Sequence, residues 1–381
     1  MDKLRVLNII SDTNIGGAGR CVLNYLKYRD QDRFDVKVAM PQGSLLKPRV
    51  EALGVPALEV AGISDRSLDL AAIGTLKRLI RSEGAQVVHT HGTMSGRIAG
   101  RLAGAKVVFT RHSVFPVPVY LSRQPGRLVN KLVNEFFADE MIAVAEAAKD
   151  NLTDSGISPR RITVVLNGVE PLPPLSPEER AAARQAFGLG PDDFAVGILA
   201  RLEQVKGHQY LIQAAQLLRD QGRPIKVVIA GAGGCEAELK TLVRAFGLED
   251  TVLFAGFVQE VGRLLAALDV QANASYGTEA TSLSLLEGMS LGLPAVVSDY
   301  GGNPGVIQDG VNGLLFPVRD AQALADALAR LMDDPSLRQK LSDGAKAVYQ
   351  STFTADRYAR TIEQVYLRAA GKTTHTGGPK L

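Results

Sequence analysis

This sequence of 381 residues has few cysteines, a small net charge and no long apolar run, and each of these features excludes some classes of protein. The two cysteines, Cys21 and Cys235, have neither a disulfide-like nor a metal-like spacing, which fits a reducing compartment. No apolar run reaches the roughly 18 residues of a membrane span, and the stretch before Ser11 is too short for the core of a signal peptide. A balance of 43 basic and 40 acidic residues gives a net charge of +3, too little to favour nucleic acid. We therefore expect a cytoplasmic protein with no nucleic-acid partner.

Short β-branched apolar runs alternate with helical patterns in two series, as is typical of strands covered on both faces in parallel sheets. The first series occupies 5–11, 35–40, 57–60, 86–90, 106–110, 140–145 and 162–168. The second occupies 195–200, 226–231, 251–256, 269–274, 294–299 and 313–317, with helical segments at 207–222, 234–247 and 282–292. These series predict an α/β protein with two doubly wound parallel sheets, one in each of two Rossmann-like domains.

The proline-rich segment 171–177 separates the two series and predicts a connection between domains. We place the N-terminal domain at 1–167 and the C-terminal domain at 168–353. An apolar stripe predicts a last helix at about 354–370 that packs back on the N-terminal domain. The remaining residues, 371–381, lack periodicity and are expected to form a flexible tail.

Glycines follow two of the predicted strands, at the sheet edge where parallel sheets bind ligands. Gly16 and Gly17 precede a helix and would let backbone amides approach an anionic ligand, although a plain turn explains them equally well. Gly231 and Gly233 lack the third glycine of the dinucleotide fingerprint, so we do not expect a nicotinamide site there.

Three histidines lie on or just after predicted strands. His89 and His91 are two residues apart and share one face of a strand, which suggests a metal site. Because no carboxylate or cysteine cluster accompanies them, we favour histidines that pack and form hydrogen bonds inside the fold. His112 follows strand 106–110 directly, beside Arg111, and its position leaves a functional and a structural role equally open.

Two cations follow the first strand of the second series. Arg201 and Lys206 precede a helix that begins near Gly207. A guanidinium binds oxygens in a fork and an ammonium adds a point charge, so the two suit a diphosphate. The alternative is a solvated turn, since such basic pairs are common on protein surfaces.

Two glutamates, Glu279 and Glu287, are eight residues apart. On one helix they would lie about 12 Å apart along the axis, too far to share one ligand atom. We expect Glu279 in a loop, a helix start near 281–282, and Glu287 more than one turn inside. The two carboxylates would then meet opposite ends of an elongated ligand, while the amides of Ser282 and Leu283 face its anionic middle.

The helix start has a second interpretation. Ser284 and Glu287 have the spacing of a capping box, in which Glu287 would satisfy the helix's own start. This interpretation explains only one of the two glutamates.

Taken together, these segments resemble the family 4 glycosyltransferases, retaining nucleotide-sugar enzymes of the GT-B fold. The resemblance is carried by EATSLSLLEGMSLGLP at 279–294, ARLEQVKG at 200–207 and SDYGGNPGVIQDGVNGLLFP at 298–317. It extends from GGAGR at 16–20 through TRHS at 110–113 to the last helix. It implies two Rossmann-like domains that face an interdomain cleft, and a nucleoside-diphosphate sugar, which we expect to be a UDP-sugar, as the donor.

The resemblance also implies a role for each candidate side chain. Arg201 and Lys206 match the basic pair that holds the donor diphosphate, and Glu287 matches the carboxylate that accepts hydroxyls of the ribose. Glu279 matches the glutamate that contacts the donor sugar, and His112 matches the histidine that reaches the transferred sugar.

Backbone positions complete the implied donor site. Gly17, with Gly16 before it, matches the glycine that lets the chain approach the phosphates. The loop whose backbone meets the base corresponds to Gly256, Phe257 and Val258.

Three positions depart from the family pattern. Gly305 stands where many relatives carry a glutamate, Thr281 stands where a larger residue is frequent, and Gly288 replaces a common alanine. A glycine inside a helix costs about 0.5–1 kcal/mol.

The implied mechanism needs neither metal nor cofactor, and we identify no metal-binding carboxylate cluster in the sequence. Arg201, Lys206 and helix amides would neutralise charge on the departing phosphate. For retention, Glu279 would position the sugar rather than attack it as a nucleophile.

Two other functions stay open: a nucleotide-sugar 2-epimerase of the same architecture, and a non-catalytic sugar-nucleotide binder, which the glycine at 305 makes conceivable. The acceptor is also open between a glycan or glycolipid of a surface polysaccharide pathway and a small molecule. Segment 115–137 mixes Arg123, Arg127 and Lys131 with apolar residues, as a helix that touches anionic lipid does. Its periodicity favours an ordinary amphipathic helix with its apolar side on the sheet.

Overall fold

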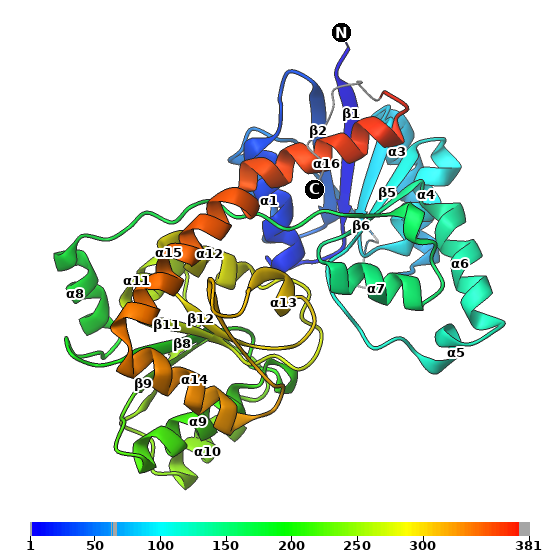
Figure 1. The fold of residues 1–381 in the computed structure, drawn as a ribbon. Helices are drawn as coiled ribbons and strands as arrows, with labels where there is room; N and C mark the ends of the chain where they lie inside the picture. Colours follow the sequence, from blue (N-terminus) through cyan, green and yellow to red (C-terminus); the bar gives the residue numbers. More distant parts are fainter. Residues whose placement is uncertain (1, 62, 64–66, 373–381) are drawn as a thin grey trace. The chain divides into compact units, whose positions relative to one another are not determined.

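A computed structural model describes residues 2–61, 63 and 67–372, which divide into two compact units (Figure 1). The first unit contains the described residues up to Gly168 together with those from Ala355 onward, and the second contains Val169–Thr354. Most of the predicted tail lies outside the described residues. Its first two residues, Gly371 and Lys372, donate backbone hydrogen bonds to the end of the last helix.

The first unit is built on a parallel sheet of seven described strands in the order β3-β2-β1-β4-β5-β6-β7. The strands are β1 (Leu4–Ile10), β2 (Phe34–Pro41), β3 (Ala57–Val60), β4 (Val87–His91), β5 (Lys106–Arg111), β6 (Glu140–Ala143) and β7 (Ile162–Val164). In β1, Val6 lies between Val36 of β2 and Val87 of β4. The order therefore runs outward from β1 in both directions, which is the doubly wound arrangement.

The helices of the first unit connect and cover these strands (Figure 1). They are α1 (Gly17–Tyr28), α2 (Lys47–Glu51), α3 (Leu70–Ser82), α4 (Met94–Ala103), α5 (Val119–Ser122), α6 (Gly126–Phe137), α7 (Glu146–Asp154) and α16 (Ala355–Ala369). Leu7 and Ile9 of β1 pack in a buried cluster with Leu76 and Ile80 of α3.

The last helix, α16, belongs to the core of the first unit. Tyr366 is fully buried, and its ring stands edge-on to that of Tyr25 on α1, with centroids 5.7 Å apart. At its end, Arg368 forms an ion pair of 3.0 Å with Glu140 of β6. The apolar side of α16 therefore packs inside the first unit, although this helix follows the second unit in the sequence.

The second unit repeats the arrangement with six described strands in the order β10-β9-β8-β11-β12-β13. The strands are β8 (Ala195–Leu199), β9 (Lys226–Ala230), β10 (Val252–Gly256), β11 (Val270–Asn273), β12 (Ala295–Ser298) and β13 (Gly313–Phe316). The helices are α8 (Pro177–Ala186), α9 (His208–Asp220), α10 (Glu236–Ala245), α11 (Val261–Ala267), α12 (Leu283–Leu291), α13 (Asn303–Val306), α14 (Ala321–Asp333) and α15 (Pro335–Thr352). The prediction of two doubly wound parallel sheets is confirmed, because every predicted apolar run forms a strand of one of them.

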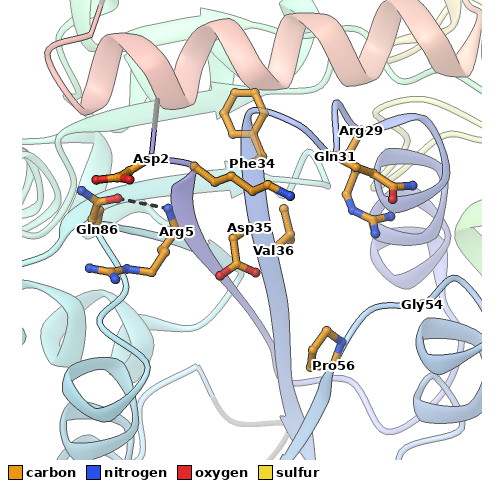
Figure 2. A pocket seen from close by; sticks show the side chains of 11 residues that line it. Asp2, Arg5, Arg29, Gln31, Phe34, Asp35, Val36, Gly54, Pro56 and Gln86 are labelled. Atoms are coloured by element: carbon orange, nitrogen blue, oxygen red, sulfur yellow. Dashed lines mark hydrogen bonds between the residues drawn. The ribbon is translucent and has the colours of Figure 1, made fainter.

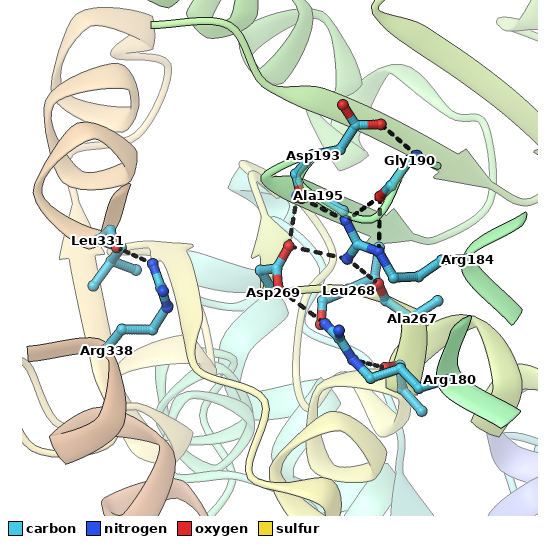
Figure 3. A network of polar contacts seen from close by, with 11 residues as sticks. Arg180, Arg184, Gly190, Asp193, Ala195, Ala267, Leu268, Asp269, Leu331 and Arg338 are labelled. Atoms are coloured by element: carbon cyan, nitrogen blue, oxygen red, sulfur yellow. Dashed lines mark hydrogen bonds and ion pairs between the residues drawn. The ribbon is translucent and has the colours of Figure 1, made fainter. Parts of the chain in front are cut away.

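Helix α8 is fixed to its sheet by a buried polar network (Figure 3). The side chain of Arg184 is 4% exposed and donates hydrogen bonds to the carbonyls of Gly190 and Ala267. Both Arg184 and Arg180 form ion pairs with Asp269, at 3.2 and 2.9 Å. Asp269 also accepts from the amide of Ala195 at 2.8 Å, so the network joins α8 to the start of β8.

The prediction that segment 115–137 packs its apolar side on the sheet is wrong. In α6 the leucines and Phe136 are exposed, whereas Asn134 is buried. The helix turns its asparagines inward because they bond to groups beneath it: Arg97 donates to Asn134 at 2.7 Å, and Asn130 donates to the Ser155 carbonyl at 2.8 Å. Within the described part of the chain, no helix is long and apolar enough to cross a bilayer.

Candidate active site

The predicted donor residues follow the carboxyl ends of strands in the second unit. Arg201 and Lys206 follow β8, Gly256 ends β10, and Glu279 follows β11. Because these strands are parallel, their carboxyl ends lie at one edge of the sheet, where ligands of open α/β sheets bind.

Lys206 and Glu279 form an ion pair at this edge. The Lys206 ammonium lies 2.9 Å from Oε2 of Glu279, and the two side chains are only 13% and 8% exposed. The same carboxylate oxygen accepts from the Ser275 hydroxyl at 2.9 Å and from the Asn273 amide at 3.5 Å. Three donors therefore fix the orientation of the Glu279 carboxylate in a largely water-free place.

Glycine backbones bring the surrounding loops into contact. Gly207 has φ +71°, and a Cβ there would lie 2.0 Å from the Ala274 carbonyl oxygen. Gly301 has φ +59°, and a Cβ there would lie 2.2 Å from the Glu279 carbonyl oxygen. Thr278 adopts φ 56°, which is unusual for a residue with a side chain. The loops after β8, β11 and β12 thus pack backbone against backbone, which holds Lys206 and Glu279 in place.

Arg201 is not part of this cluster. Its side chain is 72% exposed and forms an ion pair of 2.7 Å with Glu203. The structure therefore brings Lys206 and Glu279 together but leaves Arg201 directed to a neighbour in its own loop. That Arg201 and Lys206 together bind a diphosphate stays a prediction.

Glu287 lies where the spacing of the glutamates predicts. Ser282 is the N-cap of α12, and its hydroxyl accepts from the Leu285 amide at 3.4 Å. Glu287 is the fifth residue of the helix and is buried, which confirms a position more than one turn inside. The capping-box interpretation is wrong, because Ser284 donates to the Leu199 carbonyl at 3.1 Å and does not cap the helix.

The first amides of α12 complete this edge. In an α-helix the first four amides lack partners within the helix and carry the positive end of its dipole. In α12 these amides include those of Leu283 and Ser284. The loop after β11 therefore ends in a group of donors suited to an anion.

Two of the departures from the family pattern have different physical settings. A Cβ on Gly288 would lie 2.2 Å from Oε1 of Gln271, a residue that is 2% exposed, so the glycine makes room for this buried amide. A Cβ on Gly305 would meet no atom within 4 Å. A larger residue at 288 would have to displace the end of the Gln271 side chain, whereas a larger residue at 305 would displace no atom.

The loop predicted to meet the base begins at the end of β10. Gly256 has φ +63°, and its carbonyl accepts from the Gly231 amide at 2.7 Å. Phe257 is 77% exposed, and Val258 packs against a buried cluster. Gly231 itself has φ +145°, and a Cβ there would lie 2.0 Å from the Ala200 carbonyl oxygen. Close packing between loops explains this glycine without a dinucleotide.

In the first unit, Gly16 and Gly17 lie where β1 leads into α1. Gly16 is the N-cap and Gly17 the first helical residue, and no side chain caps this helix start. A Cβ on Gly17 would meet no atom within 4 Å. Packing inside the protein does not require a glycine at 17, which leaves the approach of a ligand as a reason for it.

His112 ends a buried chain of hydrogen bonds at the same edge of the first sheet. Its Nε2 lies 2.9 Å from Nδ1 of His91, and Nε2 of His91 lies 3.0 Å from Oδ1 of Asn8. Nearby, Nδ1 of His89 lies 2.7 Å from the Tyr366 hydroxyl. The prediction that His89 and His91 pack and form hydrogen bonds inside the fold is confirmed.

Burial keeps these histidines neutral at physiological pH. It lowers the pKa of His112 to about 4 and that of His89 to about 3. The pKa of His91 is held well below its usual range, first by burial and then by the neighbouring His89 and His112. His112 can therefore offer a neutral imidazole to a ligand but not a cation.

The sequence reasoning missed the residues that support these side chains. Asn273 and Ser275 orient Glu279, and Asn8 and Tyr366 extend the histidine chain. Asn273 is a polar residue at the carboxyl end of β11, and this position is a signal that could have identified it. Tyr366 gives no such signal, because its partner lies 277 residues away.

A separate cavity of about 590 Å³ lies at the amino ends of β1 and β2 (Figure 2). It is lined by basic and acidic residues together, including Arg5, Arg29, Asp2 and Asp35. This place is at the opposite end of β1 from Gly16 and Gly17. Its mixed charge favours no single class of ligand, and we do not assign it to the site.

Comparisons with known proteins agree with the geometry. A family model described as Glycosyl transferases group 1 matches residues 179–348, and one described as Glycosyltransferase Family 4 matches residues 15–171. The chain is 31% identical to a D-inositol 3-phosphate glycosyltransferase of Actinosynnema mirum, over 87% of this chain and 85% of that protein. It is 27% identical to the UDP-Gal:alpha-D-GlcNAc-diphosphoundecaprenol alpha-1,3-galactosyltransferase of Escherichia coli, over 93% and 97%. The crystal structure of Anabaena Alr3699/HepE in complex with UDP matches with a TM-score of 0.82 at 24% identity, covering 95% of this chain and 99% of that one.

Proposed function

Because the chain belongs to the family 4 glycosyltransferases and has the GT-B fold, we propose that it moves a hexosyl-type sugar from a UDP-sugar to a hydroxyl acceptor with retention of configuration. The observation that carries this proposal is the buried pair of Lys206 and Glu279, 2.9 Å apart at the carboxyl edge of the second sheet. A cation and a carboxylate held side by side match the two ends of a sugar diphosphate, since one binds phosphate oxygens and the other binds hydroxyls.

In the proposed donor site, Lys206 and the first amides of α12 bind the diphosphate. Arg201 joins them by leaving Glu203, a rearrangement that its exposure allows. Glu287 accepts the ribose hydroxyls, and the backbone of Gly256, Phe257 and Val258 meets the base. We assign Gly16, Gly17 and His112 to the donor on the resemblance alone.

Negative charge builds up on the phosphate as the sugar leaves. Preorganised donors that face this charge lower the barrier, and Lys206 is preorganised by its bond to Glu279. Oε2 of Glu279 already accepts from Lys206, Ser275 and Asn273. Glu279 therefore positions the sugar by binding the hydroxyls of the sugar. We propose that the reaction needs no bound metal, since cationic side chains and amides supply the stabilisation.

The acceptor in this proposal is a lipid-linked or polysaccharide intermediate. The Escherichia coli relative is named for a diphosphoundecaprenol acceptor, which supports a lipid-linked intermediate. The Actinosynnema relative is named for inositol 3-phosphate, which keeps a small soluble acceptor in view. We further propose that the protein works in the cytoplasm in peripheral contact with the membrane through residues 115–137.

A donor screen tests the proposal. The chain is incubated with each UDP-sugar and, as controls, with GDP- and ADP-sugars, and binding is measured by calorimetry and slow hydrolysis by release of the nucleotide. NMR of the first sugar released distinguishes retention from inversion, and a chelator tests metal independence. Binding of UDP that is equal in the wild type and in Lys206→Ala would contradict the assigned site.

The same incubation separates the alternatives from the main proposal. Formation of an epimer from donor alone, with no sugar released, would indicate the 2-epimerase. Binding of UDP without hydrolysis or transfer to any acceptor would indicate a non-catalytic binder. Neither alternative predicts a released sugar whose appearance is lost in Glu279→Ala.

A further inference from the structure

Helix α6 is amphipathic but has the reverse orientation to an ordinary surface helix. Its buried position is Asn134, while Leu128, Val129, Leu132 and Phe136 are 49–59% exposed. At 100° per residue, Asn130 and Asn134 lie on one side of the helix and Leu132 lies nearly opposite them. The helix therefore presents its apolar side to the outside.

This orientation is fixed by specific contacts. Arg97 of α4 is buried and donates to Asn134 at 2.7 Å, and Asn130 donates to the Ser155 carbonyl at 2.8 Å. The Ser158 amide donates to Glu135 at 2.9 Å. Turning the apolar side inward would break these bonds and leave the buried guanidinium of Arg97 without its acceptor, so the exposed side cannot be hidden by a simple rotation.

The neighbouring helix α5 also carries exposed apolar side chains. We define the α5–α6 surface by Val119, Tyr120, Leu128, Val129, Leu132 and Phe136, which are 49–70% exposed. Figure 1 shows α5 next to α6. Single exposed apolar residues are ordinary, but a group on two adjacent helices marks a place of interaction.

Basic residues border this surface. Between 115 and 137 the chain carries three cations, Arg123, Arg127 and Lys131, and one anion, Glu135, a local net charge of +2. On α6, Arg127 and Lys131 are one turn apart and lie between the asparagine side and the leucine side. Their long side chains can reach past the helix while the apolar side is buried.

We propose that the α5–α6 surface docks on an anionic lipid bilayer, with α6 lying in the plane of the interface. A helix with an apolar side and bordering lysine and arginine residues is the form that inserts to the level of the headgroups. The leucines and Phe136 enter the acyl boundary, and Arg123, Arg127 and Lys131 meet the headgroup phosphates. The charge decides for an anionic lipid over a neutral one, because cations near such a surface add attraction that salt weakens.

This inference deepens the proposed peripheral contact, and vesicle sedimentation without any nucleotide sugar tests it. The full chain is spun with vesicles of phosphatidylcholine alone and with vesicles that also contain phosphatidylglycerol. We expect binding to the anionic vesicles that weakens with salt. In Leu128→Ser/Leu132→Ser the partition coefficient should fall by at least about 10-fold. In Arg127→Gln/Lys131→Gln it should fall by about 30-fold on anionic vesicles only, since each cation near the surface contributes about 1 kcal/mol.

Matched controls come from α3 of the same unit. Leu70→Ser removes a leucine that is 74% exposed at the start of α3, and Lys77→Gln/Arg78→Gln removes two cations from the same helix, whose Ala72, Leu76 and Ile80 are buried. Both controls should bind as the wild type does. Circular dichroism verifies that all four variants are folded.

Equal vesicle binding by the wild type and Leu128→Ser/Leu132→Ser would overturn the inference. So would self-association in sedimentation velocity that depends on Leu132 and is not accompanied by vesicle binding. Because no donor is present, failure here leaves sugar transfer untouched, and a protein that binds vesicles without transferring sugar would fail only the proposed function.

Discussion

Replacing Lys206 by methionine removes the cation of the buried pair while keeping a side chain of similar length. Glu279 would then keep the Ser275 and Asn273 donors at 2.9 and 3.5 Å but lose its charged partner. Breaking a buried ion pair costs about 3–5 kcal/mol. Because two neutral donors remain, we expect a loss of about 2–3 kcal/mol in the free energy of unfolding of the second unit.

The expected loss is large enough to measure by thermal unfolding. For a unit of the size of Val169–Thr354, 1 kcal/mol corresponds to a shift of roughly 2–4 °C, so Tm should fall by about 4–12 °C. A second change, Glu279→Gln, removes the charge that was left without a partner. Lys206→Met/Glu279→Gln should therefore be more stable than Lys206→Met alone, with a coupling energy of at least about 1 kcal/mol.

A matched control is available on α10 in the same unit. Lys240 and Glu236 form an ion pair of 2.6 Å, but their side chains are 46% and 43% exposed. Lys240→Met should cost less than about 0.5 kcal/mol, because exposed pairs contribute little. Similar losses in Lys206→Met and Lys240→Met would refute the argument that burial makes the Lys206 pair special.

The same variant tests the site as well as the fold. A hydrogen bond to a charged group contributes about 1.5–3 kcal/mol, so Lys206→Met should weaken UDP binding by about 10- to 160-fold. Calorimetry with UDP measures this, and Lys240→Met again serves as the control. Unchanged UDP affinity in a stably folded Lys206→Met would remove Lys206 from the donor site.

Three further predictions concern Gly288, the buried histidines and Asp269. Gly288→Ala should destabilise the second unit by about 1–3 kcal/mol in urea unfolding, because the new Cβ would lie 2.2 Å from Oε1 of Gln271. Adding Gln271→Ala should restore most of this loss. A Gly288→Ala variant that is more stable than the wild type would show that the Gln271 side chain moves freely. Burial lowers the pKa of His112 to about 4 and that of His89 to about 3, whereas a histidine in the unfolded chain has a pKa near 6.5. The free energy of unfolding of the first unit should therefore fall as the pH drops from about 6.5 towards 4. The fall at pH 5 should be about 2 kcal/mol for each histidine. Urea midpoints across this pH range check the fall, and an unchanged slope in His112→Gln would speak against its part in it. Asp269→Asn should cost about 2–4 kcal/mol, because it leaves the Arg184 guanidinium, on a side chain that is 4% exposed, without its charged partner; a loss below about 1 kcal/mol would mean that the carbonyl acceptors suffice.

The strands could be predicted from sequence because each is a short, nearly continuous apolar run between turn residues. All thirteen predicted runs form described strands, and the order of each sheet follows from the doubly wound pattern. A continuous apolar run can be recognised from neighbouring residues alone, so a buried strand is predicted without knowing which distant segments cover it.

The direction of α6 could not be predicted, because it depends on residues far along the chain. Periodicity shows that the helix has an apolar side but not which side faces inward. That choice is made by Arg97, 37 residues before Asn134, and by the Ser155 carbonyl, 25 residues after Asn130.

The candidate site was predicted to the level of loops and not of side-chain contacts. Parallel strands place Lys206 and Glu279 at one sheet edge, although the two are 73 residues apart, and the structure adds their direct contact. The direction of Arg201 was not predictable, since Glu203 in the same short loop competes for it. The two serines at 282 and 284 illustrate a different limit, because both fit a cap and only the contact of Ser284 with Leu199 decides between them.

The place of α16 has a consequence for the order in which the protein is made. The described strands of the first sheet are all synthesised before the second unit begins, but Tyr366, which packs beside Tyr25 and His89, is added only after the second unit. A nascent chain that ends at Gly168 has a complete sheet with a vacant place where α16 belongs. The first unit therefore reaches its final packing only after the residues of the second unit have been synthesised.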